Sequence, residues 1–132
     1  MQAESLEERL EWFAQHEKHN LPVIVLEMDG KVIAWASLSF YHQRCGYRQT
    51  AEPSVYVAAE YLGKGYGRHL ADHILAIAKE KGYHCLVCLV CSENSASINL
   101  LVELGFEKVG ELKEVGRKFD RWLNVTILEK IF

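Results

Sequence analysis

Apolar residues recur at helical spacing in three parts of the chain. The first part begins at Ser5, which forms a capping-box pattern with Glu8. The second runs from Arg68 to Lys81, and the third begins after Asn94, a residue type that favours helix N-caps. The apolar positions of the first part are Leu6, Leu10 and Phe13. The pattern therefore predicts three helices.

Short apolar runs between and after these helices predict strands. A turn signal at residues 28–31 joins the first two strands as a hairpin. Residues 85–91 are apolar on both faces, which is typical of a central strand. The order of elements predicts an α/β fold, a central mixed sheet with helices on both faces, in a single domain of residues 1–132. The expected strands are residues 21–26, 31–40, 52–57, 85–91, 106–115 and 122–131.

Net charge and hydropathy argue against a nucleic-acid-binding protein and against a membrane-spanning helix. The formal net charge is −3, whereas a general nucleic-acid-binding protein is usually basic. No apolar run approaches the ~20 residues that a membrane-spanning helix needs. Residues 1–5 are polar and include an acidic side chain, unlike a secretory signal. We therefore expect a cytoplasmic protein without nucleic-acid or membrane partners.

Cysteine and histidine spacing does not indicate a metal site. Cys85, Cys88 and Cys91 have a cluster-like spacing, but they lie in an expected strand. Side chains alternate between faces along a strand, so Cys88 would point away from the other two. His69 and His73 share a helix face, but no third ligand is evident. We expect no bound metal.

A glycine-rich segment, residues 62–67, lies between an expected strand and an expected helix. Three glycines in five residues permit backbone conformations that other residues avoid. The N–H groups at a helix N-terminus lack partners within the helix and lie at the positive end of its dipole. Such a turn suits a phosphate or a diphosphate. The segment therefore predicts a phosphate-bearing, anionic ligand.

Two motifs resemble the GCN5-related N-acetyltransferases (GNAT). Gly65 and Gly67 match the small positions of the family's Arg/Gln-x-x-Gly-x-Gly/Ala pattern, with Leu62 in its first position. Asn94-Ser-Ala-Ser97 followed by Leu-Gly-Phe at 104–106 resembles the family's second signature. The resemblance covers nearly the whole chain and implies the GNAT acyltransferase fold with acetyl-coenzyme A as co-substrate. The implied binding residues are Val55, Tyr56, Val57, Leu62, Gly63, Lys64, Gly65, Tyr66, Gly67, Arg68, Asn94 and Ser97.

Within the family, residues 44–57 and 116–125 are similar to the phosphinothricin acetyltransferase branch. Asn124 stands where that branch usually has Asp. The resemblance implies transfer of an acetyl group to the primary amine of an amino-acid-like acceptor, such as phosphinothricin or methionine sulfoximine. It assigns Glu52 as the base, implies a homodimer, and places an oxyanion-binding amide near Val57 or Ala58. Candidate acceptor-binding residues are Arg44, Tyr47, Thr50 and Lys118.

Three other interpretations remain. Acceptors in this family also include protein N-termini and lysines. The branch usually has a strand and a helix before the position of Ser5, and their absence would expose apolar surface and a strand edge. A non-catalytic acyl-coenzyme-A-binding or interaction module is therefore a second alternative. A Rossmann-type nucleotide binder is disfavoured, because no acidic ribose-binding residue follows in the expected context.

Overall fold

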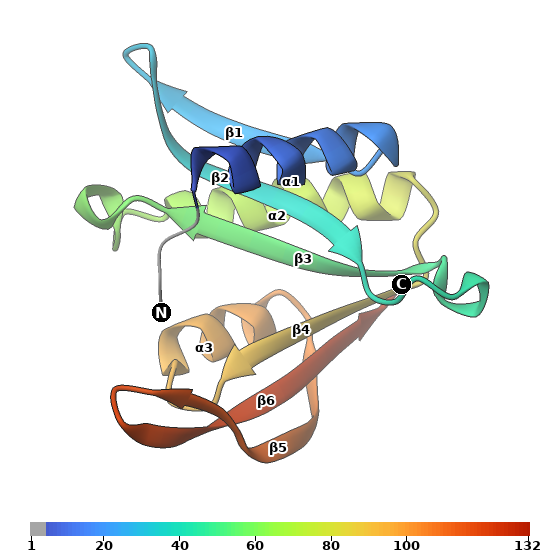
Figure 1. Ribbon diagram of the computed structural model, residues 1–132, viewed down its shortest axis with the longest axis vertical. Helices are drawn as coiled ribbons and strands as arrows, with labels where there is room; N and C mark the ends of the chain where they lie inside the picture. The colour runs from blue at the N-terminus through green and yellow to red at the C-terminus, as the bar shows by residue number, and fades with distance from the viewer. Residues whose placement is uncertain (1–4) are drawn as a thin grey trace. The chain divides into compact units, whose positions relative to one another are not determined.

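A computed structural model describes residues 5–132 of the chain (Figure 1). The acidic residue among positions 1–4, used above against a secretory signal, lies outside the described part. No helix in the described part is long and apolar enough to cross a membrane. In chain order the elements are α1 (Leu6–Lys18), β1 (Val23–Met28), β2 (Lys31–Phe40), η1 (Cys45–Tyr47), β3 (Thr50–Val57), η2 (Ala59–Tyr61), α2 (Tyr66–Glu80), β4 (Cys85–Cys91), α3 (Ser95–Glu103), β5 (Glu107–Lys118) and β6 (Arg121–Ile131).

The strands form a mixed sheet in the order β1-β2-β3-β4-β6-β5. The β3–β4 pair is parallel, whereas the β1–β2, β4–β6 and β5–β6 pairs are antiparallel. This confirms the predicted α/β class with a mixed sheet. The chain forms two compact units: the described residues up to Ser39 with Pro53–Ala78, and Phe40–Glu52 with Lys79–Phe132. Strand β3 therefore contributes its first three residues to the second unit and the rest to the first.

The first unit contains α1 and α2 on opposite faces of its strands (Figure 1). The predicted capping box is present, because Ser5 and Glu8 exchange side-chain hydrogen bonds with each other's backbone N–H. The hairpin turn has Asp29 and Gly30 at positive φ, as a tight two-residue hairpin requires. The fully buried positions of this unit lie mainly on β2 and α2: Ile33, Ala34, Ala36, Leu38, Leu70, Ala71, Ile74 and Ala78.

Helix α1 packs on β2 through residues other than the three apolar residues that recur at helical spacing. Leu6, Leu10 and Phe13 recur at helical spacing but are exposed. The contact is made instead by Trp12, whose ring meets Trp35 edge-on at 5.4 Å, and by His16, the buried residue of the helix. The helix prediction is thus confirmed, but the three apolar residues that recur at helical spacing do not form the buried side of the helix.

In the second unit, β4, β6 and β5 form an antiparallel sheet, and the start of β3 pairs with β4 in parallel. Its core contains Leu86, Cys88, Leu128, Ile98 and Phe106. The four cysteines are free. Of the three on β4, only Cys88 is buried, in agreement with the predicted alternation of faces. In the described part no group of three His, Cys, Asp or Glu side chains is arranged to hold a metal ion.

Element boundaries differ from the predictions by a few residues. Helix α2 begins at Tyr66 rather than Arg68, because Tyr66 and Gly67 already follow the helical path. Strand β1 begins at Val23, and β5 continues to Lys118 instead of ending near residue 115. Strand β5 is longer because it pairs with β6 as far as Lys118, and the local sequence does not indicate this pairing.

Two serines on β2 should respond to alanine in opposite directions. The Ser37 hydroxyl is buried and has no hydrogen-bond partner in the part of the chain that the structure describes. Ser37→Ala should therefore raise the free energy of unfolding by about 1 kcal/mol. The Ser39 hydroxyl lies 3.0 Å from Nε2 of the buried His16, so Ser39→Ala should lower it by about 1 kcal/mol. Urea denaturation of both variants checks the signs, and equal destabilisation would contradict the argument.

Candidate functional site

The turn before α2 has a backbone path that only its glycines adopt without strain. Gly63 and Gly65 have φ of 75° and 84°, in the left-handed region. A Cβ added at either position would meet no atom within 4 Å, so conformation rather than space requires glycine there. The Gly65 carbonyl oxygen accepts a hydrogen bond from His69 N–H at 3.1 Å and starts the helix. The turn thus ends on the open N-terminus of α2.

Main-chain amides of this turn are available to a ligand. In the described residues, no hydrogen-bond acceptor is found for the N–H groups of residues 63–67. Residues 63–65 are exposed, and the helix dipole adds partial positive charge. Lys64 lies beside the turn, with its Nζ 5.5 Å from the centre of the Tyr61 ring. Free amides, a helix N-terminus and a cation form a site that fits a phosphate or diphosphate.

The end of β3 lies beside the first turn of α2. A Cβ at Gly67 would be 3.6 Å from Val57 Cγ2, which is ordinary contact. Tyr56 is exposed, and its ring stacks on Trp35 with centroids 6.0 Å apart. The Ala58 N–H donates to the Ile33 carbonyl oxygen at 2.9 Å. The amide of Ala58 is therefore engaged within the fold, and of the two predicted oxyanion-binding amides only Val57 remains a candidate.

Glu52 lies in the second unit, in the part of β3 that follows the pairing of Ala51 with Leu86. Its side chain is half-buried, and this desolvation raises the pKa of the carboxyl above 4.5. The charge of Glu52 also affects the buried Cys88. Burial, and then the negative charge of Glu52, raise the pKa of the Cys88 thiol to about 12. A carboxylate with a raised pKa is suited to accepting a proton near neutral pH.

The predicted acceptor-binding residues also belong to the second unit but lie at separate places on it. Arg44 precedes η1, and its N–H donates to His42 Nδ1. Tyr47 ends η1, with its ring near those of Tyr41 and His42. Thr50 begins β3 opposite Cys85, and Lys118 ends β5 with its Nζ over the Phe119 ring.

Asn94 and Ser97 have a clear local role at the start of α3. The Asn94 side-chain oxygen accepts a hydrogen bond from Ser97 N–H at 3.2 Å, as the N-cap prediction requires. The Asn94 N–H donates to the Cys91 carbonyl oxygen. The pair therefore fixes how α3 leaves β4, which is sufficient structural reason for the two residue types.

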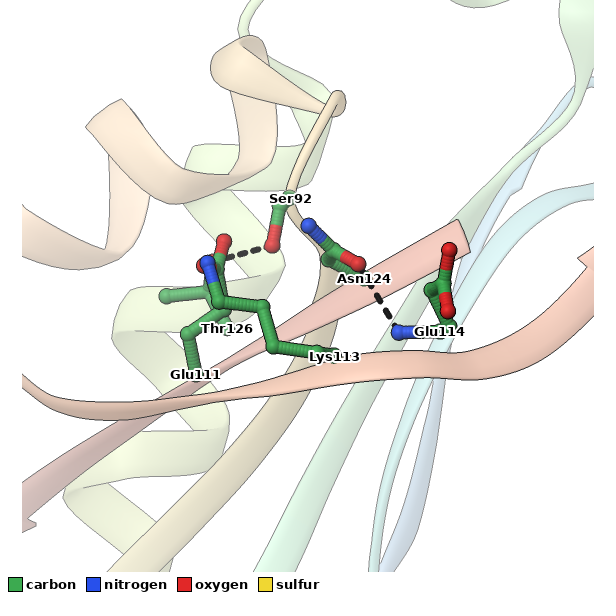
Figure 2. Close-up of polar contacts among 6 residues, drawn as sticks. All are labelled: Ser92, Glu111, Lys113, Glu114, Asn124 and Thr126. Atoms are coloured by element: carbon green, nitrogen blue, oxygen red, sulfur yellow. Dashed lines mark hydrogen bonds and ion pairs between the residues drawn. The ribbon is translucent and has the colours of Figure 1, made fainter. Parts of the chain in front are cut away.

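Polar contacts that the sequence did not reveal join β5, β6 and Ser92, the residue that follows β4 (Figure 2). The oxygen of the Asn124 side chain accepts from Glu114 N–H at 2.8 Å, at a bulge where Glu114 has a φ of 53°. Ser92 Oγ and Thr126 Oγ1 are hydrogen-bonded at 2.8 Å. Hydrogen bonds from Lys113 and then Ser92 lower the pKa of Glu111. The Asn124 that replaces the branch's usual Asp thus holds the bulge of β5.

The structure groups the candidate residues by unit. The first unit brings together the end of β3 and the glycine turn: Val55, Tyr56, Val57, Leu62, Gly63, Lys64, Gly65, Tyr66, Gly67 and Arg68. The second unit holds the candidate base, the start of α3 and the acceptor-binding candidates: Glu52, Asn94, Ser97, Arg44, Tyr47, Thr50 and Lys118. Sequence order alone could not group them in this way, because β3 runs from one unit into the other.

Comparison with known proteins agrees with this geometry. Residues 2–106 match the acetyltransferase (GNAT) family. An L-methionine sulfoximine/L-methionine sulfone acetyltransferase of Salmonella typhimurium (strain LT2) is 38% identical over 92% of this chain and 71% of its own length. A ribosomal-protein-alanine N-acetyltransferase of Brucella melitensis has a similar structure, with a TM-score of 0.96 and 37% identity over 99% of this chain and 81% of that one.

A third relative was solved with the expected co-substrate. It is a phosphinothricin acetyltransferase of Sinorhizobium meliloti in complex with acetyl-coenzyme A, with a TM-score of 0.93 and 29% identity over 98% of this chain and 70% of that one. The family match spans most of the chain and includes the glycine turn and the capped start of α3. The chain therefore belongs to the acetyltransferase (GNAT) family.

Proposed function

We propose that this chain transfers an acetyl group from acetyl-coenzyme A to the primary amine of a small, amino-acid-like acceptor. The observation that carries the proposal is the glycine turn, whose amides at residues 63–67 have no acceptor in the described part of the fold. These amides would bind the diphosphate of acetyl-coenzyme A. Lys64 and Arg68 would add positive charge, and Asn94 and Ser97 would contact the pantetheine arm.

Glu52 is proposed as the base. An ammonium ion has no lone pair, so the acceptor amine must lose a proton before it attacks the thioester carbonyl carbon. The raised pKa of Glu52 suits it to take this proton directly or through water. The neutral amine would then add to the carbonyl carbon, forming the C–N bond and a tetrahedral oxyanion. The carbonyl would re-form as the C–S bond breaks, the nitrogen would lose its second proton to solvent, and the leaving thiolate of coenzyme A would take up a proton from solvent. The Val57 amide would stabilise the oxyanion, since that of Ala58 is engaged.

The acceptor class is proposed from the named relatives. The Salmonella relative is named for methionine sulfoximine and methionine sulfone, and the Sinorhizobium relative for phosphinothricin. Arg44 is suited to an acceptor carboxylate, because a guanidinium binds that group through two parallel hydrogen bonds. Tyr47, Thr50 and Lys118 would complete the acceptor contacts.

The proposal also includes an alternative acceptor, the domain organisation, the cellular location and the oligomeric state. A protein N-terminus is a second candidate acceptor, favoured by the structural likeness to the Brucella ribosomal-protein-alanine enzyme. We propose that residues 1–132 act as one N-acetyltransferase domain in the cytoplasm, as a homodimer, without a metal. A panel of amino acids and N-terminal peptides, assayed for free thiol released from acetyl-coenzyme A, distinguishes the acceptors. A non-catalytic module would bind acetyl-coenzyme A and release no thiol with any acceptor.

Binding of acetyl-coenzyme A should depend on the conformation of Gly65. The ligand should stabilise the wild-type chain by about 2.7 kcal/mol when its concentration is about one hundred times the Kd. Gly65→Ala places a side chain at positive φ, strains the turn by about 1 kcal/mol and should weaken binding. Gly46→Ala is the matched control, because Gly46 has ordinary φ and open space around it. Thermal denaturation with and without ligand measures both effects, and an unshifted wild type would reject the proposed ligand.

Replacement of Glu52 should separate chemistry from binding. Glu52→Gln should lower kcat by about a hundredfold and leave the thermal shift by acetyl-coenzyme A intact. Desolvation raises the pKa of Glu52 in the folded state, so the ionised carboxylate destabilises the fold at a pH above this pKa. The neutral Glu52→Gln variant should therefore be no less stable than the wild type at pH 8. In the wild type, kcat/KM should fall as the pH drops through the raised pKa, and this limb should vanish in the variant. Unchanged turnover would remove Glu52 as the base.

A further inference from the structure

A polar loop, residues 41–49, carries two of the proposed acceptor-binding residues, Arg44 and Tyr47. It connects β2 to β3 and contains η1, and every one of its residues is exposed. Its last residue is anchored, because the Gln49 carbonyl oxygen accepts a hydrogen bond from His84 N–H at 2.8 Å. Burial contributes little to the conformation of this loop, so contacts among its own residues hold Arg44 and Tyr47 in place.

His42 makes the contact that fixes the backbone of Arg44 on its N-terminal side. The His42 Nδ1 accepts a hydrogen bond from Arg44 N–H at 3.1 Å. On the other side of the same residue, the Arg44 carbonyl oxygen accepts a hydrogen bond from Tyr47 N–H at 3.0 Å, which closes the turn of η1. Both main-chain polar groups of Arg44 are therefore engaged, although the residue lies in an exposed loop.

Ring contacts hold the imidazole of His42 beside this hydrogen bond. The centroids of the His42 and Tyr47 rings are 5.0 Å apart. The Tyr47 ring in turn meets the Tyr41 ring edge-on, with centroids 5.7 Å apart and an interplanar angle of 69°. Aromatic pairs at these distances stabilise one another. Because Nδ1 accepts a hydrogen bond, the proton of the neutral imidazole lies on Nε2.

The side chain of Arg44, in contrast to its backbone, is available to a ligand. Arg44 is exposed, and within residues 5–132 its guanidinium has no hydrogen bond, ion pair or ring contact. A guanidinium binds a carboxylate through two parallel hydrogen bonds, so the contact is directional. A backbone that is already fixed in the free protein loses less freedom on binding, and this pre-organisation strengthens the contact.

We infer that His42 is a positioning residue of the acceptor site. Its Nδ1 fixes the backbone of Arg44, so that the guanidinium meets the carboxylate of an amino-acid acceptor. The inference deepens the acetyl transfer proposed above and rests on it, since Arg44 is the candidate for that contact. His42 itself touches no substrate and transfers no proton. Its loss should therefore raise KM for the acceptor and leave both kcat and KM for acetyl-coenzyme A unchanged.

Asparagine and glutamine at position 42 test the hydrogen bond, because both remove the ring. The side-chain oxygen of asparagine is the same number of bonds from Cβ as Nδ1, so His42→Asn can accept from Arg44 N–H, as in an Asx-turn. The oxygen of glutamine is one bond farther away, in the place of Nε2, so His42→Gln loses the contact. In the assay of thiol release, His42→Gln should raise KM for the acceptor about fivefold relative to His42→Asn.

The first acceptor to use is L-methionine sulfone, followed by the best amino acid of the panel described above. Gln43→Ala is the matched control, because Gln43 is exposed in the same loop and its removal leaves the hydrogen bond between His42 and Arg44 intact. This variant should have the KM of the wild type. Circular dichroism shows that each variant is folded. Equal KM values for His42→Asn and His42→Gln would overturn the inference.

A double-mutant comparison shows whether His42 acts through Arg44. In a chain that carries Arg44→Ala, His42→Asn and His42→Gln should have the same KM, because no guanidinium remains to be positioned. The carboxamide of the same acceptor, which lacks the carboxylate, should also fail to distinguish the two variants. A difference that persists in Arg44→Ala, or a loss of kcat at unchanged KM, would show that His42 acts by another route and would overturn the inference.

Nuclear magnetic resonance tests the hydrogen bond independently of activity. Long-range proton–nitrogen spectra of the wild type in mildly alkaline buffer should show the His42 proton on Nε2. A proton on Nδ1 would overturn the role of His42 and leave the proposed acetyl transfer standing. A wild type that releases no thiol with any amino acid of the panel would overturn the acetyl transfer to such acceptors and the role of His42 together.

Discussion

The proposed binding of acetyl-coenzyme A depends on one constraint: within residues 5–132, the main-chain N–H groups of residues 63–67 at the start of α2 have no internal acceptor. A fold normally satisfies such groups, because an unsatisfied buried amide costs free energy. Here the turn is exposed, and Gly63 and Gly65 adopt a positive φ that other residues avoid. The helix begins immediately afterwards and adds its dipole. The proposed diphosphate site would therefore depend on the backbone, through glycine residues and the start of a helix.

The proposed role of Glu52 as the base depends on the burial of its carboxyl group. Glu52 occurs in the second unit, where partial desolvation raises its pKa, and Cys88 beneath the sheet stays protonated and neutral, with a pKa of about 12. A cationic neighbour would have lowered the pKa of the carboxyl and made it a weaker base. Partial burial thus raises the basicity of this carboxylate.

The helices and strands were largely predictable because their signals are local. The capping box at Ser5, the cap at Asn94, the glycine turn and the hairpin at Asp29-Gly30 each specify backbone geometry within a few residues. The sequence was less informative where contacts with residues far away in the chain decide how an element packs. The spacing of Leu6, Leu10 and Phe13 indicates the helix but not its packing. Helix α1 packs through Trp12 and His16, which contact Trp35 and Ser39 of β2.

By itself, the sequence determined the α/β class, the glycine turn before a helix and, through its resemblance to a family, the candidate residues. These properties follow from local backbone preference and from motif order. Only the tertiary structure decided that the Ala58 amide is engaged by Ile33, that Asn124 holds the bulge at Glu114, and that Glu52 is desolvated. It also showed that one side of the β4–β6–β5 sheet is apolar and uncovered. These facts depend on strand register and on burial, and both are set by the packed fold rather than by neighbours in sequence.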